Sequence, residues 1–166
     1  MKGLIVRLTL KLRLLLFALL CTLLAVGTTG ATAAPPTLAS GTYTYTDSYF
    51  ESFRVAGPNV VIEVVATVEY TGTLTGTSEV RGTIVVHPDG SANFRDVEVF
   101  TGTVNGVPGT LTFRLSGKND AGLNVEATST IIAATGDLSG QHGALALDGS
   151  VRFPQGPFGT YSGRLQ

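Results

Sequence analysis

The chain has 166 residues, with 11 basic and 12 acidic side chains and a formal net charge of −1. Cys21 is the single cysteine, so an internal disulfide framework and a multi-thiolate metal site are excluded. No run of Lys and Arg follows residue 13, which excludes the clustered cations that nucleic acids and anionic membrane surfaces require.

Residues 1–33 have the order of a secretory signal peptide. Four basic residues precede Leu14, an uncharged Leu-rich run extends to Val26, and Ala31-Thr32-Ala33 forms an A-x-A cleavage site. The apolar run is shorter than the ~20 residues that span a bilayer, so cleavage is favoured over an uncleaved anchor. We therefore expect a secreted or periplasmic protein with no membrane association after cleavage. The remaining 7 basic and 12 acidic residues give it a charge of −5.

Residues 34–40, which contain Pro35 and Pro36, are expected to form an extended spacer before one domain at 41–166. Period-two alternation dominates this domain, and no window has helical periodicity. Turn signals separate the alternating runs at Gly57-Pro58-Asn59, Pro88-Asp89-Gly90, Asn105-Gly106, Lys118-Asn119-Asp120 and Asp148-Gly149. About eight strands joined by hairpins predict an all-β fold, a single closed antiparallel barrel, with a two-sheet sandwich as the alternative.

Three Gly-spaced blocks carry a family resemblance. They are EYTGTLTGTS at 69–78, TGTVNGVPGTLTF at 101–113 and TGDLSGQHG at 135–143. Over roughly residues 66 to 150, the chain resembles a bacterial family of unknown function whose members are similar in fold to the allene oxide cyclase barrel. The resemblance implies an eight-stranded barrel with an internal cavity, related to barrels that hold oxidised lipids. No residue of the plant cyclase's catalytic set is matched, so no catalytic role is carried over.

The strand that begins at Phe94 has no obvious apolar face. Phe94, Asp96, Glu98 and Phe100 share one side, and Arg95, Val97, Val99 and Thr101 share the other. One interpretation is an ordinary exterior face that carries the two acids. In the other, Asp96 and Glu98 line the barrel interior between two phenylalanines, as a polar handle in an apolar ligand site. On the second interpretation, Phe94, Asp96, Glu98 and Phe100 are the candidate ligand-binding residues.

The rest of the sequence offers little catalytic machinery. His87 and His142 are the only histidines, and two distant histidines do not make a metal site, so we predict neither a metal nor a cofactor. The favoured function is an exported barrel that holds a small apolar or amphipathic molecule. An isomerase or cyclase acting on a lipid-like ligand is a less favoured alternative. A ligand-free surface or adhesive domain is another, suggested by Tyr43, Tyr45 and Tyr49. The sequence does not indicate an oligomeric state.

Overall fold

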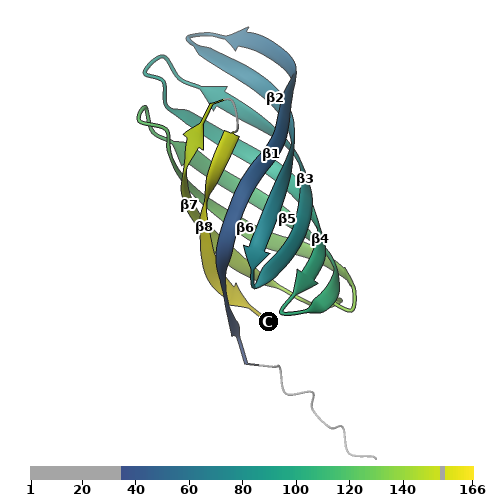
Figure 1. The fold of residues 1–166 in the computed structure, drawn as a ribbon. Coiled ribbons are helices and arrows are strands. Elements are labelled where there is room, and N and C mark those ends of the chain that lie inside the picture. The colour runs from purple at the N-terminus through teal and green to yellow at the C-terminus, as the bar shows by residue number, and fades with distance from the viewer. Residues whose placement is uncertain (1–34, 154–155) are drawn as a thin grey trace, which may run out of the picture. The chain divides into compact units, whose positions relative to one another are not determined.

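The computed structural model describes residues 35–153 and 156–166. Eight strands follow one another in these ranges: β1 (Thr37–Ala56), β2 (Asn59–Gly72), β3 (Leu74–Val86), β4 (Ala92–Val104), β5 (Val107–Asn119), β6 (Asn124–Gly136), β7 (Gly143–Arg152) and β8 (Gly156–Leu165). Each strand pairs antiparallel with the next, and β8 pairs with β1 to close the ring (Figure 1). The predicted all-β barrel is confirmed, and the sandwich alternative is wrong because one continuous sheet contains all eight strands.

The start of the chain differs in part from expectation. The predicted signal peptide at 1–33 lies outside the described residues. β1 begins at Thr37, inside the predicted spacer, because residues 37–44 pair with β8. Within the described ranges, no helix is long and apolar enough to cross a membrane.

One predicted Gly-containing turn is present in the structure, and another predicted turn lies inside a strand. Asn105 and Gly106 connect β4 and β5 with φ values of 51° and 83°, the left-handed conformation that an Asn-Gly turn favours. Asp148 and Gly149, predicted as a turn, instead lie inside β7. Gly149 opposes Gly159 of β8 there, where a Cβ on either residue would overlap the partner strand's backbone. That glycine permits close strand approach and not chain reversal.

One end of the barrel is closed by packed side chains. Leu138, in the connection between β6 and β7, is 3% exposed and belongs to the hydrophobic core. The hydroxyl of Tyr161 accepts a hydrogen bond from the backbone N–H of Leu74 at 2.8 Å. The ring of Tyr70 packs edge-on against the rings of Phe100 and Tyr161, at 5.9 Å and 5.7 Å between centroids. We call the buried cluster of Tyr70, Phe100 and Tyr161 the floor.

At the opposite end, which we call the mouth, the β1–β2 hairpin extends beyond the other strands (top of Figure 1). β8 pairs with β1 only up to Thr44, whereas β2 pairs with β1 as far as Ala56. Two rows of apolar residues therefore cross the inner face of β1–β4 at this end, and we call them the mouth rows. They are Val55, Val60, Val86 and Ala92, followed by Phe53, Ile62, Ile84 and Phe94.

Candidate functional site

The structure resolves the ambiguous face of β4. Asp96 and Glu98 are 7% and 1% exposed, whereas Val97 and Val99 are 47% and 42% exposed. The two carboxyl groups therefore face the barrel interior, and the interpretation that they lie on an exterior face is wrong. The reason is the pairing of β4 with both neighbours: Asp96 lies opposite Gly82 and Leu115, and Glu98 lies opposite Val80 and Phe113.

The same register gives the depth of each candidate residue below the mouth. The row beneath the mouth rows contains Phe50, Val64, Gly82 and Asp96, and the next contains Ser48, Ala66, Val80 and Glu98. Phe94 belongs to the lower mouth row, and Phe100 belongs to the floor. All four predicted ligand-binding residues thus face inward. They span the distance from the mouth to the floor, with the carboxyl pair, Asp96 and Glu98, in the middle.

Gly82 makes room for one of these carboxyl groups. A Cβ at Gly82 would overlap the Asp96 carboxyl, because Oδ1 lies directly over this glycine. The glycine in β3, which the sequence shows only as a point of sheet flexibility, therefore sets the conformation of a candidate site residue. Any larger residue at 82 would push the carboxyl group away from β3.

Burial perturbs both carboxyl groups. It raises the pKa of Asp96 from 3.8 to about 7, with a further contribution from the charge of Glu98. It also raises the pKa of Glu98, although the nearby hydroxyls of Ser78 and Tyr70 oppose part of that rise. A carboxyl group with a pKa near 7 can gain or lose a proton at neutral pH, as a general acid or base must.

Two tyrosines adjoin the carboxyl pair. Burial, followed by the charges of Glu98 and Asp96, raises the pKa of Tyr45 well above 10. Burial and the charge of Glu98 do the same to Tyr70. The carboxyl pair therefore lies among phenol groups contributed by β1 and β2.

Several buried polar atoms of the interior lack a hydrogen-bond partner. Within the described ranges they are Tyr43 Oη, Ser78 Oγ, Asp96 Oδ1, Glu98 Oε1 and Ser129 Oγ. Buried polar atoms in native proteins are nearly always hydrogen-bonded, so a group of such atoms in one barrel needs an explanation. They are available to hydrogen-bond a bound molecule.

The sequence analysis missed Tyr45, Tyr70, Ser78 and Ser129 as site residues. Tyr70 shares the apolar parity of β2, and Tyr45 alternates with threonines, so each has the pattern of an ordinary core residue. Cross-strand register is the signal that could have found Ser78, opposite Phe100, and the face of the carboxyl pair. Counting back from the Pro88-Asp89-Gly90 turn places Asp96 opposite Gly82 and Glu98 opposite Val80, on the inward parity of β3.

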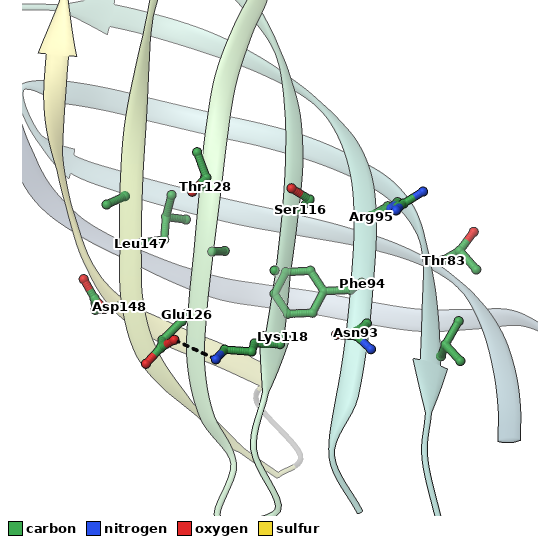
Figure 2. A pocket seen from close by; sticks show the side chains of 14 residues that line it. Thr83, Asn93, Phe94, Arg95, Ser116, Lys118, Glu126, Thr128, Leu147 and Asp148 are labelled. Carbon is green, nitrogen blue, oxygen red and sulfur yellow. Dashed lines mark ion pairs between the residues drawn. The ribbon is translucent and has the colours of Figure 1, made fainter.

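A concavity of about 920 Å³ lies on the outside of β3–β7, and we call it the outer groove (Figure 2). Two outward rows line it: Thr83, Arg95, Ser116, Thr128 and Ala146, and beside them Val85, Asn93, Lys118, Glu126 and Asp148. The ammonium of Lys118 lies 3.2 Å from the Glu126 carboxylate, and both side chains are about two-thirds exposed. Water already solvates these charges, so the outer groove is the weaker candidate site.

The two histidines make hydrogen-bond contacts near the ends of strands. His87 Nδ1 lies 3.1 Å from Asn59 Oδ1, and its Nε2 accepts a hydrogen bond from Asn93 Nδ2 at 2.7 Å. His142 Nε2 lies 3.0 Å from Gln166 Oε1. Among the residues that the structure describes, no three His, Cys, Asp or Glu side chains gather as a metal-binding set.

Comparison with known proteins identifies the family. The model of a family described as "Protein of unknown function (DUF3224)" matches residues 39–151. A crystal structure of a protein with unknown function from this family, from Shewanella oneidensis MR-1, has the same fold with a TM-score of 0.59. The two chains are 18% identical, over 79% of this chain and 96% of that one. No curated protein matches this chain. The likeness to allene oxide cyclase stays a prediction, and the chain belongs to the DUF3224 family of proteins of unknown function.

Proposed function

We propose that this protein is an exported β-barrel that binds a small amphipathic molecule inside the barrel, and that the molecule enters at the mouth. The observation that carries the proposal is the buried carboxyl pair, whose Asp96 Oδ1 and Glu98 Oε1 have no hydrogen-bond partner. Export rests on the predicted signal peptide at 1–33.

The buried carboxyl pair destabilises the folded barrel. An unsatisfied buried polar group costs about 1–3 kcal/mol, and replacing buried charges by apolar residues of similar volume is often neutral or stabilising. The neighbours of Asp96 and Glu98 on β5, Leu115 and Phe113, are apolar and buried, which is what a core that serves stability alone contains. Buried acids without partners in an otherwise apolar core are typical of binding and catalytic sites.

The mouth rows supply the other half of an amphipathic site. Phe53 and Val55 are 62% and 80% exposed, and Ile62, Ile84 and Phe94 are partly buried around them. This apolar surface lies between solvent and Asp96, so a molecule that enters head first would leave its apolar body against the mouth rows. Small-molecule sites combine an apolar lining with a few convergent polar groups in this way.

The first test is a titration of the mature protein with the uncharged dye Nile red, together with native mass spectrometry of the protein purified from an exporting host. We expect saturable binding of one dye per protein and a co-purified mass that is lost on denaturation. Phe53→Ser should weaken dye binding by about tenfold because it removes apolar contact area at the mouth. Ile132→Ser is the matched control, since Ile132 is an exposed apolar residue on the outer face of β6.

Two results would overturn the proposal. One is the absence of saturable binding, and the other is an equal loss of binding in Phe53→Ser and Ile132→Ser. Either result would favour a ligand-free surface or adhesive domain.

An isomerase or cyclase acting on the same ligand is a second candidate, favoured by the pKa of Asp96 near 7. Asp96→Asn would then abolish conversion of the co-purified ligand while it preserves binding. Recovery of the ligand unchanged after prolonged incubation with the wild-type protein would exclude this activity.

A further inference from the structure

Among the residues that the structure describes, Asp96 and Glu98 are the buried acidic side chains, and no basic side chain is buried with them. All seven Lys and Arg side chains within the described ranges are exposed, among them Arg95 on β4 itself and Arg81 and Arg114 on the neighbouring strands. His87, which follows the end of β3, contacts the side chains of Asn59 and Asn93 at hydrogen-bond distance. Asp96 and Glu98 therefore have no cationic partner in the folded barrel, although buried carboxylates are normally paired.

Aromatic rings surround the same carboxyl pair. Tyr45 and Tyr70 lie close enough to Glu98 for its charge to shift their ionisation. Phe100 packs against Tyr70 from below, at 5.9 Å between ring centroids, and Phe94 lies in the row above Asp96. Aromatic faces attract cations, and most strongly in sites that exclude water.

We infer that the ligand of this interior site carries a cationic head group, an amine or alkylammonium, on an apolar body. The inference rests on the proposed function and deepens it, because it specifies which amphipathic molecules the barrel selects. The head group would hydrogen-bond to the free carboxyl oxygens and lie against the tyrosine rings. The apolar body would remain at the mouth rows.

Charge complementarity distinguishes this class from the alternatives. A fatty acid would bring a third carboxyl group into a site that already holds two and has no base to neutralise it. An alcohol could hydrogen-bond to the carboxyl pair but could not stabilise its ionised form. An ammonium group provides hydrogen-bond donors and a positive charge that stabilises the ionised carboxyl pair against the cost of burial, which makes it the best complement.

The test compares three ligands with the same alkyl chain: dodecylamine, dodecanol and dodecanoate. Each displaces Nile red from the mature protein near neutral pH, below the concentration at which it forms micelles. We expect dodecylamine to bind at least about tenfold more tightly than dodecanol, with dodecanoate the weakest of the three. Native mass spectrometry checks that one molecule binds per protein.

Variants locate the bound amine. In Asp96→Asn/Glu98→Gln the preference for dodecylamine over dodecanol should disappear, while dodecanol affinity changes by less than about threefold. Glu98→Gln alone should reduce the preference in part, and it serves if the double variant does not fold. Glu79→Gln/Glu126→Gln is the matched control, because it removes the same number of charges from exposed positions on the outer face.

The outcomes separate the two proposals. If none of the three ligands nor the dye binds, the proposed function fails, and this inference fails with it. If dodecanol or dodecanoate binds as tightly as dodecylamine, the cationic head group is refuted while the proposed function stands. If the control variant loses the preference as fully as the interior variant, the amine binds outside the barrel, and this inference is refuted.

Discussion

Replacing Asp96 by Asn should remove much of the pH dependence of folding stability in the neutral range. The pKa of Asp96 is about 7 in the folded protein and near its ordinary value of 3.8 in the unfolded chain. Between these values the folded state keeps a proton that the unfolded state has lost, so the wild-type protein becomes less stable as pH rises. Above the folded pKa this loss is complete, and below 3.8 it is absent.

The magnitude follows from the size of the shift. Each pH unit between the two pKa values corresponds to about 1.4 kcal/mol, so the whole interval amounts to about 4 kcal/mol as an upper figure. Glu98, on the same face of β4, also has a raised pKa and contributes with the same sign. Tyr45 of β1 titrates far above this range, and the neighbours of Asp96 on β3 and β5 are Gly82 and Leu115, which do not titrate.

The assay is urea denaturation of the wild-type protein and Asp96→Asn at several pH values between about 5 and 8. The wild-type free energy of unfolding should fall by about 2–3 kcal/mol across this range, and the variant should lose most of that slope. Asp47→Asn, at an exposed position on β1, is the control and should retain the wild-type slope. Equal slopes in the wild type and Asp96→Asn would refute the assignment of a buried, protonated carboxyl group at this position.

Three further substitutions test the structure around the site. Gly82→Ala should destabilise the protein by about 1–3 kcal/mol, because the added Cβ overlaps the Asp96 carboxyl. The loss of stability should be smaller in an Asp96→Ala background. Additive effects in this double-mutant cycle would contradict the contact. Tyr161→Phe should lower the free energy of unfolding by about 1–3 kcal/mol and speed amide hydrogen exchange at Leu74, whose N–H loses its acceptor. Unchanged exchange at Leu74 would argue against the hydrogen bond. Phe100→Ala should cost about 3–5 kcal/mol in chemical denaturation, since its ring is fully buried in the floor, and a cost below 1 kcal/mol would show a loosely packed floor.

The local sequence pattern predicts most of the strands and some of the turns. Alternation of Thr, Tyr and Val with period two predicts strands because successive side chains of a strand point to opposite faces. Asn105-Gly106 predicts a tight turn because both residues tolerate positive φ. The turn at Thr73, by contrast, is not signalled, because the apolar parity continues unchanged from β2 into β3. Asp148-Gly149 gives a false signal, since glycine serves close strand approach as well as chain reversal.

The candidate site depended on tertiary structure. By itself the sequence determined that Asp96 and Glu98 share one face of β4, but aromatic residues flank them on that face and valines occupy the other. Both faces are therefore equally suited to burial. The pairing of β4 with both neighbouring strands decided that the acids face the interior, and only the pairing with β3 could have been counted from a turn in the sequence. Closure of the barrel also brought Tyr45 and Tyr70, from strands remote in sequence, beside the carboxyl pair, because side-chain proximity across a sheet depends on register and not on local pattern.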